Sequence, residues 1–299
     1  MTYDILIAGG GPAGMTAALY AARAGKTVAM IEQIAPGGQM MNTPDIDNYP
    51  GFEKIAGYEL SMKMQAHAES AGAVTIYDQI LSLDKKDDLF HLTGNGGVYT
   101  AKSVIVCAGA KRRKLGVPGE EEFAGRGVSY CAVCDGNFFR GRVTAVNGGG
   151  NTALEDALYL SAICEKVYLI HRRDSFRGSP FLAEKVKNQK NIELILSSVV
   201  QSINGDAAVT SLTLQTPSGE RIIDTSALFV AVGSIPDTAI LPENVARDGN
   251  GYILTDEQMR TNIKGLYAAG DLRSSPLKQI VTACSDGAIA ATAAANDLA

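Results

Sequence analysis

The feature that most constrains the fold is a pattern of apolar strand, glycine-rich turn and helix that occurs twice in the chain. An apolar run leads into residues 9–14, and a second apolar run leads into residues 148–153. The correspondence continues past both turns at one constant offset, so that the Ala-Leu-Tyr at 18–20 falls on the Ala-Leu-Tyr at 157–159. Self-similarity at a fixed offset predicts that one structural unit is present twice.

Each turn has small residues where a dinucleotide-binding turn needs them. The first glycine permits the tight turn, the second lets the backbone approach a pyrophosphate, and the third small residue lets the helix pack against the strand. The helix that follows offers its free N–H groups to the phosphates. These positions are filled by Gly9, Gly11 and Gly14 in the first copy and by Gly148, Gly150 and Ala153 in the second. We expect the same turns to contribute Pro12, Ala13, Asn151 and Thr152 to the two nucleotide sites.

The residues that end the second strand of each copy predict different nucleotides. The first copy ends in Glu32, which can accept hydrogen bonds from the 2′-hydroxyl of an adenosine ribose and would repel a 2′-phosphate. The second copy has His171 at that position, followed by Arg172, Arg173 and Arg177. Because guanidinium groups match phosphate oxygens, this copy favours NADPH over NADH. A solvated basic loop after a strand is the alternative interpretation.

A motif near the end of the chain indicates that the first nucleotide is a flavin. The apolar stretch at 261–271 ends in Gly270 and Asp271, and a small-residue helix is expected at 278–295. An acidic side chain there can bind a ribityl hydroxyl, and the helix N-terminus can face the isoalloxazine ring. The sequence therefore predicts FAD in the first copy and NADPH in the second.

This arrangement predicts an α/β fold of two Rossmann-like, three-layer nucleotide-binding domains, the second inserted into the first. We expect the FAD-binding domain at 1–113 and 248–299 and the NADPH-binding domain, which contains the CxxC pair, at 117–243. Polar, glycine-containing connectors at 114–120 and 243–249 would form a hinge. Strand-like stretches such as 89–92 and 211–214 predict small antiparallel ribbons packed on each sheet.

The close cysteine pair Cys131 and Cys134 is the strongest candidate for chemistry. A zinc site would need a second such pair, and the chain has only three histidines besides, so we predict no metal. A CxxC at a helix start predicts a redox-active dithiol with one accessible and one shielded thiol. The neighbouring Asp135 is the candidate general acid, with simple helix capping as the alternative. The other cysteines, Cys107, Cys164 and Cys284, are expected to be buried small hydrophobic residues.

Composition excludes some function classes. The formal net charge of −5 argues against a general nucleic-acid binder. The uncharged stretch 5–22 contains Gly9 to Pro12, which would break a membrane helix, so we expect no membrane span. With no targeting segment recognised and an odd number of cysteines, we expect a cytoplasmic protein.

Four motifs in order resemble the low-molecular-weight (bacterial-type) thioredoxin reductases. They lie at 131–136, 148–153, 171–177 and 268–271, and the resemblance extends from residue 1 to about 290. It implies tightly bound FAD in the first domain, NADPH in the inserted one, thioredoxin as the electron acceptor and a homodimer. It also implies that the inserted domain swings between two orientations.

The resemblance further implies roles for individual residues. Cys134 would face the flavin, Cys131 would attack the disulfide of thioredoxin, and Asp135 would handle protons. The implied FAD contacts, besides the first turn and Glu32, are Gly38, Gln39, Asn48, Ala110, Gly270, Asp271, Lys278, Gln279 and Ile280. Lys278 departs from the arginine that the family usually has, and it keeps the charge without the planar fork.

Other functions remain open at this point. A ferredoxin-dependent flavin thioredoxin reductase would be expected to lack the second nucleotide motif. A reductase of another dithiol carrier shares most features, although one that serves peroxide removal normally has an added thioredoxin-like domain. A ferredoxin–NADP reductase of related fold would lack the CxxC. A non-enzymatic flavin-binding protein would not be bleached by NADPH.

Overall fold

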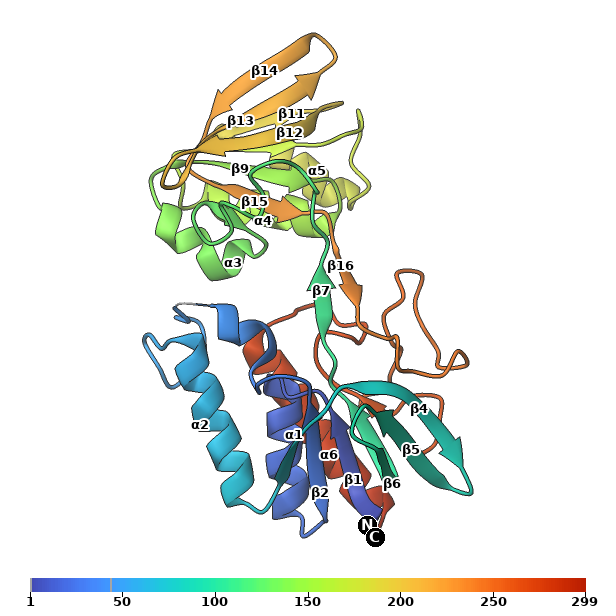
Figure 1. The fold of residues 1–299 in the computed structure, drawn as a ribbon. Coiled ribbons are helices and arrows are strands. Elements are labelled where there is room, and N and C mark those ends of the chain that lie inside the picture. Colours follow the sequence, from blue (N-terminus) through green and yellow to red (C-terminus); the bar gives the residue numbers. More distant parts are fainter. Residues whose placement is uncertain (1, 44) are drawn as a thin grey trace. The chain divides into compact units, whose positions relative to one another are not determined.

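The computed structural model describes residues 2–43 and 45–299, which form two compact units (Figure 1). Unit 1 comprises Met1–Lys111 and Ile235–Ala299, and unit 2 comprises Arg112–Ser234. The chain passes between the units in β7 (Ala110–Arg112) and in β16 (Ser234–Pro236), and these short strands pair with each other. Unit 2 is therefore inserted into the chain of unit 1.

Unit 1 is built on a mixed sheet with the strand order β3-β2-β1-β6-β5-β4, in which β17 also pairs with β6. Its strands are β1 (Thr2–Ala8), β2 (Val28–Glu32), β3 (Val74–Tyr77), β4 (Ile80–Lys86), β5 (Leu89–Gly94), β6 (Val98–Val106) and β17 (Leu266–Ala268). Its helices are α1 (Pro12–Arg23), the 3₁₀ helix η1 (Gly38–Asn42), α2 (Gly57–Ser70) and α6 (Ile280–Asp297). Helix α1 packs between α2 and α6.

Alternating side chains of the central strands enter different cores on the two faces of this sheet. Ile5 and Ile7 of β1 join the cluster formed with α1 and α6, whereas Leu6 and Ala8 join a cluster with Phe90 and the segments after residue 240. All four β1 side chains are almost fully buried. A parallel strand covered on both faces is apolar throughout, which is why the first copy of the repeat reads as a continuous apolar run.

Unit 2 has a parallel sheet with the order β11-β10-β9-β15-β8, covered on one face by α4 and on the other by a small antiparallel sheet. The parallel strands are β8 (Val128–Ser129), β9 (Val143–Gly148), β10 (Lys166–Ile170), β11 (Ile192–Ile195) and β15 (Leu228–Ala231). The antiparallel strands are β12 (Val199–Gly205), β13 (Val209–Thr216) and β14 (Gly219–Asp224). The helices are α3 (Ala132–Asp135), the 3₁₀ helix η2 (Gly136–Phe139), α4 (Asn151–Ser161) and α5 (Pro180–Lys187).

The predicted fold class is confirmed, and the differences concern details. The stretch at 89–92 is an antiparallel strand, β5, but it extends the main sheet of unit 1 through β6 instead of packing on it. Residues 235–243, which the sequence places in the inserted domain, belong by their contacts to unit 1. The reason is burial, because Leu241 and the nearby Val245 pack into the core beside Phe90.

Within the described ranges, the structure contains no helix that is both long enough and apolar enough to cross a membrane.

Candidate active site

The first glycine turn shows why each of its small residues is needed. Gly9 has a positive φ of 111°, and a Cβ there would lie 2.5 Å from the carbonyl oxygen of Cys107. A Cβ on Gly14 would lie 1.9 Å from the carbonyl oxygen of Gly9, so only glycine lets α1 pack this closely. Among residues 2–43 and 45–299, a Cβ on Gly11 would meet no atom within 4 Å. Gly11 therefore borders open space at the N-terminus of α1, as a pyrophosphate site requires.

The N-terminus of α1 is also left with free backbone donors. Gly11 is its N-cap residue and provides no side-chain cap, and Pro12 occupies the first turn. The carboxylate of Glu32, at the end of β2, lies beside this turn and accepts a hydrogen bond from the Gly10 N–H at 2.7 Å. Glu32 thus stands next to the turn, where an adenosine ribose would follow the pyrophosphate. Ala13 is buried behind the turn.

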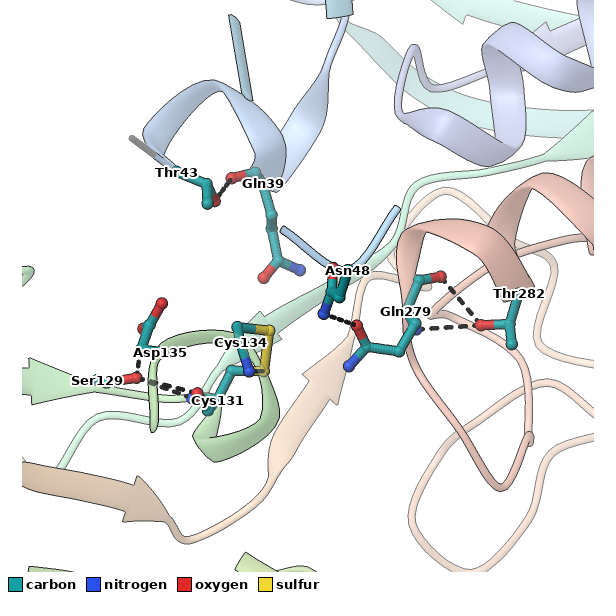
Figure 2. Close-up of a disulfide and its surroundings, with 9 residues drawn as sticks. All are labelled: Gln39, Thr43, Asn48, Ser129, Cys131, Cys134, Asp135, Gln279 and Thr282. Carbon is teal, nitrogen blue, oxygen red and sulfur yellow. Dashed lines mark hydrogen bonds between the residues drawn. A yellow bond between two sulfur atoms is a disulfide. The ribbon is translucent and has the colours of Figure 1, made fainter. Parts of the chain in front are cut away.

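Other residues predicted to contact FAD gather around the same turn. A Cβ on Gly38, which has a positive φ of 55°, would lie 3.5 Å from the Cα of Gly11. Gln39 donates from Nε2 to the carbonyl oxygen of Ala110 at 2.8 Å. Asn48 donates from Nδ2 to Oε1 of Gln279 at 3.2 Å (Figure 2). Unit 1 therefore brings together residues that lie far apart in the sequence.

The loop after β17 joins these residues to the start of α6. Gly270 has a positive φ of 84°, and a Cβ there would lie 3.0 Å from the Cβ of Ala13. Gln279 caps α6 through a reciprocal pair of hydrogen bonds with Thr282. Asp271 and Ile280, at the two ends of this loop, are both partly exposed.

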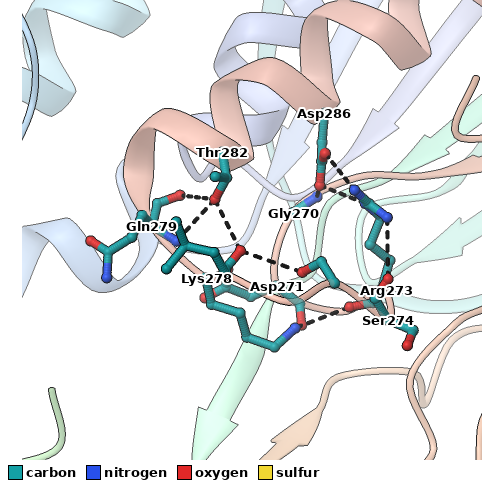
Figure 3. Close-up of polar contacts among 10 residues, drawn as sticks. Gly270, Asp271, Arg273, Ser274, Lys278, Gln279, Thr282 and Asp286 are labelled. Carbon is teal, nitrogen blue, oxygen red and sulfur yellow. Dashed lines mark hydrogen bonds and ion pairs between the residues drawn. The ribbon is translucent and has the colours of Figure 1, made fainter. Parts of the chain in front are cut away.

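Two cations hold this loop in place (Figure 3). Arg273 forms a two-pronged ion pair with the buried Asp286 of α6, at 2.7 and 2.8 Å, and the same carboxylate accepts the Gly270 N–H at 3.1 Å. Lys278 donates from Nζ to the carbonyl oxygens of Asp271 and Arg273, at 2.9 and 3.0 Å. The Lys278 ammonium thus supports the loop, and we expect any contact of this residue with a cofactor to come from its backbone.

The second glycine turn repeats the design of the first. A Cβ on Gly148 would lie 2.4 Å from the carbonyl oxygen of Ala231, and Ala153 is completely buried. A Cβ on Gly150 would meet nothing within 4 Å in the described part of the chain, and Gly150 caps α4 without a side-chain hydrogen bond. Thr152 is exposed in the first turn of α4. Unit 2 therefore also presents an open, uncapped helix N-terminus.

The residues after β10 surround this turn. Asn151 accepts the Ser179 N–H at its Oδ1, at 2.7 Å, which ties the following loop to the turn. His171 is buried and stacks on Phe176, with ring centroids 5.6 Å apart, and its Nε2 has no hydrogen-bond partner within the described part of the chain. Burial lowers the pKa of His171, and the neighbouring arginines lower it further. The ring is therefore expected to be neutral at pH 7.

Three arginine side chains belong to the segment that follows β10, beside the second glycine turn. Arg172, Arg173 and Arg177 are exposed, and their guanidinium groups make no hydrogen bond or ion pair among the residues that the structure describes. Cations that lack internal partners on a nucleotide-binding turn are suited to an anionic ligand group such as a phosphate.

The cysteine pair lies at the start of α3 and is joined by a disulfide (Figure 2). Cys131 is the N-cap residue, and its Sγ accepts the Cys134 N–H at 3.2 Å. Both cysteines are partly exposed, so exposure alone does not distinguish an accessible from a shielded sulfur. Cys131 caps α3, and Asp135, although it is the N-cap residue of the following η2, makes no side-chain cap hydrogen bond there.

Asp135 has a partner that sequence reasoning missed. The Ser129 hydroxyl donates to Asp135 Oδ2 at 2.6 Å and accepts the Cys131 N–H at 3.1 Å. The only sequence signal was a hydroxyl residue close before the first cysteine, which is too common to single out. The Arg273–Asp286 pair was also missed, because its partners lie on different elements.

The remaining cysteines are unpaired. Cys107 and Cys164 are buried as predicted, while Cys284 is only partly buried. Burial raises the pKa of each of these thiols. No group of histidine, cysteine, aspartate and glutamate side chains that could hold a metal ion occurs over residues 2–43 and 45–299.

Comparison with known proteins gives a consistent result. A family model described as pyridine nucleotide-disulphide oxidoreductase matches residues 3–287. A curated thioredoxin reductase from Listeria innocua is 45% identical over 291 residues, covering 96% of this chain and 91% of that protein. The crystal structure of thioredoxin reductase from Streptococcus pyogenes has a TM-score of 0.92 and 44% identity, covering 99% of this chain and 98% of that one.

The crystal structure of a ferredoxin-flavin thioredoxin reductase from Clostridium acetobutylicum is less similar. It has a TM-score of 0.54 and 30% identity, with coverage of 99% of this chain and 98% of that one.

Proposed function

The chain belongs to the thioredoxin reductases of the pyridine nucleotide-disulphide oxidoreductase family, and we propose that it passes electrons from NADPH through FAD and the Cys131–Cys134 pair to the disulfide of thioredoxin. FAD would supply the two-electron carrier between nicotinamide and dithiol. The observation that carries the proposal is the combination of two open glycine turns and one CxxC disulfide in a single chain. Each of these three sites has a separate task.

Unit 1 is proposed to hold FAD. Gly11 and the uncapped start of α1 would receive the pyrophosphate, and Glu32 would bind the adenosine ribose. The loop from Gly270 to Gln279, fixed by Lys278 and by Arg273, would present Asp271 and the start of α6 to the flavin end of the cofactor. The fit rests on the space at Gly11 and on free backbone donors, which together match an anionic dinucleotide.

Unit 2 is proposed to hold NADPH. Gly150 and the start of α4 would receive its pyrophosphate, and the unpaired guanidinium groups after β10 would bind its 2′-phosphate. This set of cations favours NADPH over a ferredoxin donor, because a chain that took electrons from ferredoxin would have no use for a 2′-phosphate site.

The donor assignment is tested by steady-state kinetics with NADPH and NADH. Replacing Arg172 and Arg173 with alanine should lower kcat/KM for NADPH at least about 30-fold and leave that for NADH within about threefold, because two charge-assisted contacts of roughly 1–2 kcal/mol each are lost. A matched control replaces the exposed Lys187 and Lys190 of the same unit with alanine and should change neither value. Equal losses with both nucleotides would refute the 2′-phosphate site.

Thioredoxin is the proposed acceptor. Val133 of α3 and Phe138 of the adjoining η2 are apolar side chains that are 42% and 51% exposed. Apolar residues around a reactive disulfide suit a protein substrate better than a small polar one. A reductase of another dithiol carrier is the second candidate, and comparing kcat/KM for thioredoxin with that for a small dialkyl disulfide distinguishes the two.

We also propose that the chain forms a homodimer through the helices of unit 1. Tyr20 of α1 and Ile289 of α6 are 45% and 37% exposed and line one hollow of about 510 Å³. Tyr58 and Met62 extend exposed apolar surface over α2. Replacing Tyr20 and Ile289 with lysine should convert dimer to monomer in sedimentation velocity, whereas lysine at the exposed Ile222 of unit 2 should not.

A cytoplasmic location is part of the proposal. It is supported by three cysteines that are free in the structure and by the reducing donor that the enzyme would use.

A further inference from the structure

We propose that Ser129 is a positioning residue that holds the Asp135 carboxylate for proton transfer at the Cys131–Cys134 pair. The proposal rests on the proposed function, because it assumes that this pair reduces a disulfide. It assigns a role to a side chain outside the CxxC motif.

The hydrogen bonds of Ser129 form a relay between the first cysteine and the acid. Its Oγ lies 2.6 Å from Asp135 Oδ2, 3.1 Å from the Cys131 nitrogen and 3.4 Å from the Cys131 carbonyl oxygen (Figure 2). A serine hydroxyl has a single proton, and the shortest contact, to the carboxylate, takes it. Ser129 therefore donates to Asp135 while it accepts from the backbone of Cys131. Each of these bonds polarises the other.

Ser129 is well placed to keep the acid in one position. It is the last residue of β8, which pairs with β15 so that Ser129 lies opposite Phe229, and it is only 6% exposed. Asp135 stands at the end of the single turn α3, where its own N–H donates to the Cys131 carbonyl oxygen at 3.1 Å. A short helix has little rigidity of its own. Ser129 thus links the Asp135 carboxylate to the sheet.

The disulfide reaction requires protons to be moved at this place. The Cys131 thiolate attacks one sulfur of the substrate disulfide, whose S–S bond breaks as a mixed disulfide forms and the first substrate thiolate leaves. Cys134 then attacks the Cys131 sulfur and expels the second thiolate, so the pair is oxidised as the substrate is reduced. The two protons released by the cysteines must reach the two departing thiolates. A carboxyl group beside the pair can accept and deliver them.

Ser129 determines how Asp135 can do this. The serine proton is donated to Oδ2, one of the two oxygens of this carboxylate. The same hydrogen bond stabilises the carboxylate relative to the carboxylic acid. Removing the hydroxyl should therefore loosen the acid and move the ionisation seen in the rate profile to higher pH.

The test uses two small disulfides whose leaving groups differ. The protein is first reduced with dithiothreitol, freed of reductant and mixed anaerobically with either bis(2-hydroxyethyl) disulfide or 5,5′-dithiobis(2-nitrobenzoic acid). The alkyl thiolate is a poor leaving group that needs a proton, whereas the aromatic thiolate leaves without one. Rates of thiol loss are measured between pH 5.5 and 9 for wild type, Ser129→Ala, Ser129→Thr, Asp135→Asn and the double variant Ser129→Ala/Asp135→Asn.

The proposal predicts selective effects. Ser129→Ala should slow reaction with the alkyl disulfide about tenfold, shift that pH profile upward, and leave the aromatic disulfide within about twofold. Ser129→Thr, which keeps a hydroxyl, should restore most of the loss. The double variant should be no slower than Asp135→Asn, because the serine acts through the aspartate.

Other results would overturn it. A merely structural serine would slow both disulfides equally or give losses that multiply in the double variant. An unchanged rate with the alkyl disulfide would also refute the role. Failure of the proposed function can be told apart from failure of the Ser129 proposal. If the wild-type protein reduces the alkyl disulfide but not thioredoxin, thioredoxin is not the acceptor, and the role of Ser129 is unaffected.

Discussion

The substitution Gly11→Ala should separate nucleotide binding from folding more cleanly than any other change in the chain. An added methyl group at Gly11 meets no atom of the described residues within 4 Å, and the φ of −72° and ψ of −176° suit alanine. Glycine-to-alanine changes at compatible positions stabilise by about 0.4–1 kcal/mol, and loss of glycine at an N-cap offsets part of this. The free energy of unfolding should therefore change by less than about 1 kcal/mol.

The same methyl group would stand where a pyrophosphate has to approach the backbone. Pushing a ligand away from a tight site costs about 1–3 kcal/mol, as overpacking does in a protein core. That corresponds to a roughly 5- to 150-fold larger dissociation constant for FAD. Gly14→Ala is the matched comparison, since its Cβ would lie 1.9 Å from the Gly9 carbonyl oxygen and must displace backbone. This second variant should lose both stability and FAD.

The assay combines urea denaturation of FAD-free protein with titration by FAD, followed through the quenching of flavin fluorescence. Gly150→Ala is the equivalent change in unit 2, because its Cβ would also meet no atom. It should weaken NADPH without affecting FAD. If Gly11→Ala binds FAD within twofold of wild type, or if Gly11→Ala and Gly14→Ala destabilise the fold equally, the reasoning from open space at the turn is refuted.

Three further outcomes follow from the structure. Cys131→Ser should abolish thioredoxin reduction and leave bleaching of the flavin by NADPH intact, and retained thioredoxin reduction would contradict the role of this cysteine. Asp286→Asn should destabilise unit 1 by about 3–5 kcal/mol in urea denaturation, because it leaves the Arg273 guanidinium without its buried partner; an unchanged midpoint would show that the ion pair contributes nothing. Burial raises the pKa of Asp156 from 3.8 to about 7. The folded state therefore retains a proton that the unfolded state releases near pH 4, and the free energy of unfolding falls as pH rises from about 4 to 7. Asp156→Asn should therefore gain about 1–3 kcal/mol over wild type at pH 8 and almost nothing at pH 3.5, and a gain equal at both pH values would rule out ionisation as the cause.

The repeated unit could be predicted from the sequence because its determinants are local. The turn at Gly9 needs a positive φ, the helix start at Gly11 needs an uncapped backbone, and the strand between two covered faces needs consecutive apolar residues. Each requirement affects residues that are neighbours in the sequence. The same holds for Gly148 and Gly150, so both copies formed the expected elements.

The course of the chain outside the repeats was harder to predict. Strand β5 joins the main sheet because β6 offers it a free edge, and an edge is a property of the assembled sheet. The end of the inserted unit lies at Ser234 because Leu241 finds its burial in unit 1. The glycine-containing connector at 243–249 marked a loop, but a loop is not necessarily a domain boundary.

Supporting side chains of the site were the least predictable part. Ser129 contacts Asp135 only because β8 ends next to a single helical turn. Arg273 reaches Asp286 from a loop onto a helix, and neither residue stands in a recognisable motif. Lys278 stays a predicted cofactor contact, and only the structure shows that its ammonium binds loop carbonyls. Motifs identify the groups that would meet a ligand, whereas the groups that hold them depend on tertiary contacts.

The proposed electron path runs within one chain from NADPH through FAD and the Cys131–Cys134 pair to thioredoxin. The most direct measurement is anaerobic absorbance spectroscopy of the purified, FAD-loaded protein, mixed first with NADPH and then with oxidised thioredoxin. The expected result is bleaching of the flavin band by NADPH and its recovery after thioredoxin is added. No bleaching by NADPH, together with bleaching by reduced ferredoxin, would contradict the donor, and bleaching without recovery would contradict the acceptor.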